Sequence, residues 1–166
     1  MFSSLFYIIL IMGPMVLVTY VEAVRSPLAG QLWGGLPRTV WYKNPWFISM
    51  GLTVVSYLYM SGMWVFELDT ARVYGQEDFQ KYVVLSYATF MTGAVLWAPL
   101  TLVALQRRQK LATVAVALWL TALGSVGMLV LAAGLKGQPW MVAAAIMCMV
   151  HHVFFDAVYW WATWQI

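Results

Sequence analysis

Three ionisable side chains, His151, His152 and Asp156, lie in an otherwise apolar stretch near the C-terminus. Ionisable groups are costly inside a membrane span, so such residues are functional candidates by default. His152 and Asp156 are four residues apart, which predicts one shared face of an α-helix, where the carboxylate accepts a hydrogen bond from the imidazole and fixes its tautomer. The pair could ligate the metal of a tetrapyrrole, handle protons or anchor a ligand. It could also simply clamp two helices together by hydrogen bonds.

The segments that must position these residues are long and apolar. Of the 166 residues, 63% are hydrophobic and 9% are charged, whereas a soluble domain has about 45–50% apolar and about 25% charged residues. The apolar runs are continuous and reach the roughly 20 residues that a membrane helix needs, which favours helices over the alternating strands of a barrel. We therefore predict an all-α membrane protein, a single domain over 1–166, with five transmembrane helices spanning about 5–24, 46–66, 82–105, 111–135 and 140–164.

Charges in the connections predict the orientation. Short loops rich in Lys and Arg stay in the cytoplasm, and the first and third connections carry such residues: Arg25, Arg38, Lys43, Arg107, Arg108 and Lys110. This distribution predicts a multi-pass protein with the N-terminus outside and the C-terminus inside. The first span lacks the basic start of a signal peptide, so we expect it to be retained.

Several function classes are disfavoured. The net charge of +3 is scattered along the chain, so no basic patch for nucleic acid is expected. Cys148 is the single cysteine, which excludes an internal disulfide, and no zinc pattern assigns a metal ligand. The sequence contains no nucleophile elbow, HExxH pair, P-loop or dinucleotide fingerprint. An enzyme is disfavoured, although isomerisation with His152 and Asp156 as acid and base remains open.

Aromatic residues suggest a binding site for a small molecule. The long first connection carries Trp33, Trp41 and Tyr42, which are too apolar for a solvated loop and predict an ordered lid over the helices. It ends at Pro45. The whole chain would contact the lipid bilayer.

The third span predicts the walls of this site. Pro99 removes a backbone hydrogen bond and should kink the helix, opening room that Trp97, Trp119 and Tyr57 would line. An apolar cavity with a few polar groups is the usual form of a small-molecule site. For each aromatic residue, packing in the core or against lipid is the alternative. In the fourth span, Gly124 and Gly127 would let another helix approach closely, either within the chain or across a homodimer.

An ordered series of motifs resembles the translocator protein family, also called tryptophan-rich sensory proteins (TspO/MBR). The first loop keeps the family's spacing of a Trp, an aromatic pair and a proline. Each of the next three spans carries a counterpart of a family motif. The matching residues are Trp33, Trp41-Tyr42, Pro45, Ser56-Tyr57, Trp97-Ala98-Pro99 and Leu118-Trp119.

The resemblance implies a five-helix bundle that binds a planar hydrophobic ligand such as a porphyrin, haem or sterol, without a covalent bond. His152 and Asp156 would add polar contacts. The chain departs from the family at Thr53 and Ala94, where a Trp and an Asn are common, and at Tyr42 and Asn44. These departures favour a second hypothesis, a small structural subunit that packs on partner proteins, pigments or lipids of a larger membrane complex.

Overall fold

The structure is a computed structural model that describes residues 4–32, 45–67, 77–135 and 138–164. Its first half contains α1 (Ser4–Arg25), the short α2 (Ala29–Leu32), and α3 (Pro45–Gly62) with a π-helical end, η2 (Met63–Glu67). Its second half contains α5 (Glu77–Arg107), α6 (Ala112–Ala133) and a last span built from α7 (Pro139–Val150), the π-helix η3 (His151–Trp160) and α8 (Trp161–Thr163).

Within the described residues, five helices are long and apolar enough to cross a membrane, so the predicted all-α bundle of five spans is confirmed. The chain is a multi-pass membrane protein. The predicted boundaries agree with the structure within a few residues, and the largest difference is in α5, which begins at Glu77 and not at residue 82. Pro45 is the first residue of α3, where its missing N–H and fixed φ suit a helix start.

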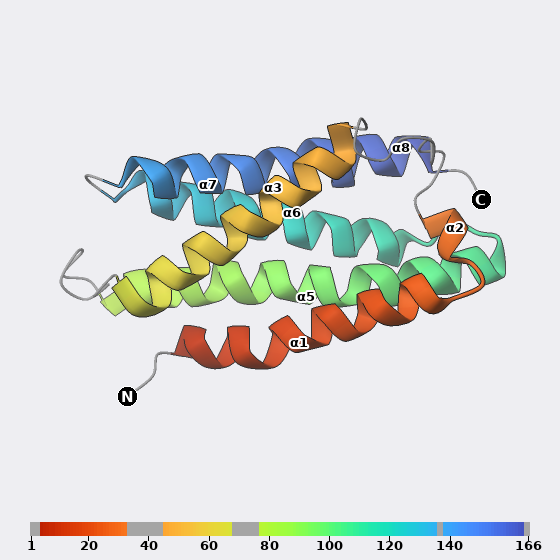
Figure 1. Ribbon diagram of the computed structural model, residues 1–166, viewed down its shortest axis with the longest axis horizontal. Coiled ribbons are helices and arrows are strands. Elements are labelled where there is room, and N and C mark those ends of the chain that lie inside the picture. The colour runs from red at the N-terminus through yellow and green to blue at the C-terminus, as the bar shows by residue number, and fades with distance from the viewer. Residues whose placement is uncertain (1–3, 33–44, 68–76, 136–137, 165–166) are drawn as a thin grey trace.

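The spans pack in an order different from their order in the sequence. α1 lies along α5, α5 along α6, α6 along the last span, and α3 along the last span (Figure 1). In the view of Figure 1, α3 crosses the bundle diagonally from the α8 end toward the start of α5. Its first half therefore contacts the last span, while its second half reaches α5, where the rings of Tyr57 and Phe90 stack at 5.4 Å.

Glycines allow the close contact between α5 and α6. A Cβ on Gly124 would lie 2.6 Å from the backbone nitrogen of Phe90, and one on Gly93 would lie 2.7 Å from the backbone nitrogen of Thr121. A Cβ on Gly127 would meet Ser86. The small residues of the fourth span thus form a seam within the chain, which answers the question that the sequence left open for Gly124 and Gly127.

Two apolar cores lie at opposite ends of the bundle, with buried polar side chains between them. The first core surrounds Met60 and Phe90, and the second surrounds Trp97 and Trp160. The intermediate level, here called the polar layer, consists of Ser49, Thr53, Thr121, Ser125, His151 and His152, which are all buried, together with Asp156. The two histidines and the aspartate that the sequence singles out therefore lie midway along the spans.

The glycine seam gives a prediction about stability. Gly93→Ala should lower the free energy of unfolding by about 1–3 kcal/mol, because its Cβ meets the backbone of α6 and neither helix can yield easily. Gly51→Ala in α3 is the matched control, since no heavy atom lies within 4 Å of a Cβ at that position. The control should be neutral or slightly stabilising. Unfolding of both variants in detergent micelles measures the difference, and equal stabilities would contradict the seam.

Candidate functional site

The π-helix η3 decides which side chains of the last span face each other. In an α-helix, residues five apart point about 140° away from each other, and residues four apart share a face. The i→i+5 hydrogen bonds of a π-helix widen the turn and bring residues five apart together. Because η3 begins at His151, Asp156 lies next to that residue, with 3.5 Å between His151 Nε2 and Asp156 Oδ1. The sequence predicted a contact between His152 and Asp156, and the structure shows that His151 is the histidine that contacts Asp156.

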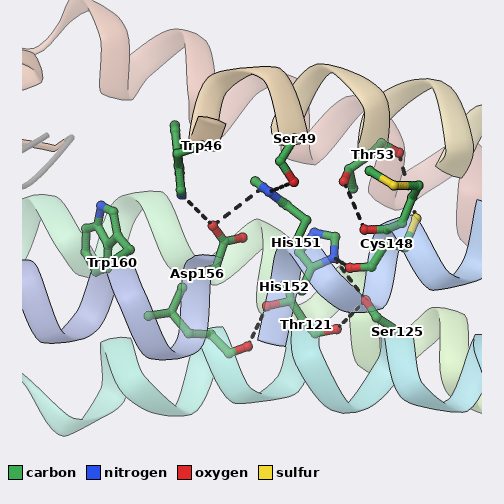
Figure 2. A network of polar contacts seen from close by, with 12 residues as sticks. Trp46, Ser49, Thr53, Thr121, Ser125, Cys148, His151, His152, Asp156 and Trp160 are labelled. Atoms are coloured by element: carbon green, nitrogen blue, oxygen red, sulfur yellow. Dashed lines mark hydrogen bonds and ion pairs between the residues drawn. The ribbon is translucent and has the colours of Figure 1, made fainter. Parts of the chain in front are cut away.

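Two side chains of α3 complete this face of the site (Figure 2). The indole Nε1–H of Trp46 donates a hydrogen bond of 3.1 Å to Asp156 Oδ1. On the other side of the imidazole, His151 Nδ1 and Ser49 Oγ lie 3.1 Å apart. His151 therefore bridges from the last span to α3, and its ring also packs against the Trp46 ring at 5.8 Å.

His152 points to a different neighbour. Its Nδ1 lies 2.7 Å from the carbonyl oxygen of Cys148 and 3.0 Å from Ser125 Oγ on α6. A backbone carbonyl can only accept, so Nδ1 carries the proton and Nε2 is the nitrogen with the free lone pair in the neutral ring. The rings of His152 and of Phe90 on α5 also pack edge to face, with 4.9 Å between their centroids. The two neighbouring histidines thus join the last span to three other helices.

Further hydrogen bonds surround this centre. Ser125 Oγ donates to the carbonyl of Thr121 at 2.9 Å, and Thr53 Oγ1 donates to the carbonyl of Met147 at 3.4 Å. Both histidines are buried, whereas 18% of the Asp156 side-chain surface is accessible. The arrangement can serve as a clamp between helices, and it also places two imidazoles and a carboxylate together inside the membrane.

The structure separates the aromatic residues that the sequence placed around one space. Tyr57 packs on the first core and Trp97 belongs to the second. Trp119 is 47% exposed on the outer side of α6, and Pro99 and Pro45 are exposed as well. α5 continues through Pro99. Trp33, Trp41 and Tyr42 lie outside the described residues.

A different group of aromatic rings gathers in the second core. Trp97 contacts Tyr20 of α1 at 5.5 Å and Trp160 at 5.6 Å, and Trp160 stacks on Trp164 at 4.8 Å. These rings and Trp161, which lies 5.8 Å from Trp164, are here called the aromatic cluster. Trp160 and Trp164 were not among the site residues predicted from the sequence, although their four-residue spacing could have indicated a shared buried face.

Two donors in the aromatic cluster have no acceptor among the described residues. The indole Nε1 atoms of Trp97 and Trp164 are buried without a hydrogen-bond partner. By contrast, Trp160 Nε1 donates to the carbonyl oxygen of Leu32 at 3.2 Å. Leu32 is the last residue of α2, so this bond ties the start of the first connection to the last span.

An open apolar groove lies between α3 and α7. Its volume is about 390 Å³, and its lining includes the rings of Tyr59 and Trp140. Trp140 is 75% exposed. This groove could not be predicted from the sequence, because its shape depends on how α3 crosses α7.

Comparison with known proteins gives no match, whether with family models, with curated proteins or with solved structures. The resemblance to the translocator protein family therefore rests on the motifs quoted above and stays a prediction.

The π-helical geometry makes a prediction that separates the two possible pairs. A double-mutant cycle with His151→Ala and Asp156→Ala should give a coupling of about 0.5–3 kcal/mol, as expected for residues in contact. The matched cycle with His152→Ala and Asp156→Ala should give a smaller coupling, because no hydrogen bond or ion pair joins these two side chains among the described residues. Unfolding in detergent micelles provides both values. A larger coupling for His152 than for His151 would show that this segment is α-helical in the membrane.

Proposed function

We propose that this chain is a TspO-like membrane receptor that binds a planar hydrophobic ligand, such as a tetrapyrrole or a sterol, at the aromatic cluster. The observation that carries the proposal is the pair of buried indole N–H groups of Trp97 and Trp164 without an acceptor among the described residues. A buried donor without a partner costs about 1–3 kcal/mol. A ligand whose edge carries a carboxylate, carbonyl or hydroxyl oxygen would remove that cost.

The neighbouring rings suit the body of such a ligand. Tyr20, Trp97 and Trp160 meet at centroid distances of 5.5 and 5.6 Å and in different orientations, so both ring faces and ring edges take part in the cluster. Aromatic faces and edges attract other flat π-systems at such distances. The cluster thus combines apolar contact area with donors, which is the usual composition of a small-molecule site.

The first connection starts and ends beside this cluster. Leu32, just before it, is held by Trp160, and Trp46, just after it, belongs to the same core. The described residues on either side of segment 33–44 therefore lie near the proposed site, which supports the proposal that Trp33, Trp41 and Tyr42 form its lid. In this proposal His152 and Asp156 are not direct contacts of the ligand, because they belong to the polar layer.

The proposal predicts which indole groups matter for binding. Trp97→Phe and Trp164→Phe keep a ring but remove the donor, and each should weaken protoporphyrin IX binding about 2- to 10-fold, as expected for one hydrogen bond. Trp119→Phe is the matched control and should bind like the parent protein, because Trp119 lies on the outer side of α6. Quenching of tryptophan fluorescence in detergent measures the affinities. Unchanged affinity in Trp97→Phe and in the double variant Trp41→Ala, Trp97→Ala would refute the proposal.

The proposed orientation places the first connection on the cytoplasmic side. The third connection should lie on the same side. Gln109 is exposed and would lie on the cytoplasmic side. A cysteine introduced there should therefore react with a membrane-impermeant maleimide only after the membrane is permeabilised. One introduced at Gln138, on the opposite face, should react in intact cells, and Cys148 is buried and should not interfere. Labelling of Gln109→Cys in intact cells would contradict the proposed orientation and indicate the opposite one.

A second candidate is the structural subunit of a larger membrane complex. α1 favours it, since only Leu5 and Ala23 of this helix are fully buried and many of its apolar residues are exposed, among them Leu10, Ile11, Leu17 and Val18. The open groove beside Trp140 is a further surface on which a partner could pack. Native gel migration in mild detergent distinguishes the two, because a stable large assembly supports the subunit and a monomer or dimer supports the receptor.

A further inference from the structure

We propose that His151, His152 and Asp156 bind one divalent first-row transition-metal ion, of the Zn²⁺ or Fe²⁺ type. One nitrogen of each histidine and one carboxylate oxygen of Asp156 lie within 4.8 Å of one another. Two imidazoles and one carboxylate are the protein ligands of many catalytic zinc sites and of non-haem iron sites. From the sequence, His152 and Asp156 were candidate ligands only for the metal of a tetrapyrrole, because the spacing of the three residues resembles no known motif for a free metal ion.

The distances are compatible with coordination after a small movement. Metal–nitrogen and metal–oxygen bonds are about 2.0–2.2 Å long, which places neighbouring ligand atoms about 3–3.5 Å apart in tetrahedral or octahedral geometry. The ligand atoms must therefore approach each other by up to about 1.5 Å, which changes in side-chain torsion can provide. All three residues lie within the single helical segment η3, so no movement between helices is needed.

Each candidate ligand is already oriented by a second residue. Metal-binding histidines usually donate their other ring N–H to a carbonyl or carboxylate, and ligating carboxylates are hydrogen-bonded in turn. His152 donates Nδ1–H to the carbonyl of Cys148, which leaves Nε2 for the metal. Asp156 accepts from Trp46.

His151 requires one rearrangement of its proton. In the structure its Nε2 faces Asp156 and its Nδ1 faces Ser49 Oγ. A serine hydroxyl can donate or accept, so Ser49 can receive Nδ1–H when the proton moves there from Nε2. Nε2 is then free to bind the metal. The α3 partner thus supports His151 both with and without an ion.

The site has room for a further ligand. Asp156 is accessible over 18% of its side-chain surface, while the histidine beneath it is 4% accessible. Three protein ligands leave coordination positions open, as in catalytic metal sites. The proposal is distinct from the planar-ligand site, because these residues lie in the polar layer and not in the aromatic cluster.

The test uses the metal alone. The full chain is purified in detergent through a tag without histidine, treated with a chelator, and titrated with Co²⁺, whose visible absorption reports nitrogen and oxygen ligands, and then with competing Zn²⁺. We expect one ion per chain. Asp156→Asn, in which the side-chain oxygen can still accept a hydrogen bond from Trp46, should weaken metal binding at least about 10-fold. Trp46→Phe, which removes the donor that orients Asp156, should weaken it about 10-fold. Glu22→Gln, which removes an exposed carboxylate of α1, is the matched control and should not change the affinity.

Two outcomes would overturn the proposal and leave the network as a clamp between helices. One is the absence of a Co²⁺ spectrum in the folded parent protein, and the other is equal affinity in the parent, Asp156→Asn and Trp46→Phe. If Asp156→Asn does not fold, Trp46→Phe and Ser49→Ala still decide between them. Because no porphyrin is present, failure here says nothing about the aromatic cluster, and a porphyrin result says nothing about the metal.

Discussion

A bilayer offers no hydrogen bonds, so a polar side chain inside the bundle must find its partner in the protein or in a bound ligand. This constraint bears most heavily on the last span, which carries two histidines and an aspartate midway along its length. The structure meets it with groups from both neighbouring spans, Trp46 and Ser49 on α3 and Ser125 on α6. The packing of α3 and α6 against the last span is therefore fixed by the donors and acceptors of that span as well as by apolar contact.

The wide turn of η3 makes this arrangement possible. In a regular α-helix the side chains of His151 and Asp156 would point about 140° apart, and one of them would face away from α3. The π-helix brings both to α3 while His152 turns toward α6 and α5. Such segments are rare and are found frequently at functional sites. The local backbone thus gives up regular helical hydrogen bonding, and the polar side chains gain partners on three helices.

The sequence was sufficient to predict the transmembrane spans. It was not sufficient to predict which side chains face each other between them. Long apolar runs predicted all five helices because hydropathy depends only on composition within a window. The direct contact predicted between His152 and Asp156 is made by His151 instead, because the prediction assumed the period of an α-helix. Trp119 and Trp97 were placed together from spacing alone, but their directions depend on the rotation of each helix about its axis. That rotation is set by contacts such as Gly93 against Thr121, which no single segment reveals.

Trp46 connects the two regions for which we propose functions. Its ring belongs to the second core together with Trp97 and Trp160, and its Nε1–H holds the carboxylate of Asp156. A phenylalanine at this position would keep most of the apolar contact and lose the donor, whereas an alanine would disturb both regions at once. The two roles of Trp46 can therefore be separated by the choice of substitution. The indole is the side chain that meets both demands, because it combines a large apolar ring with one donor.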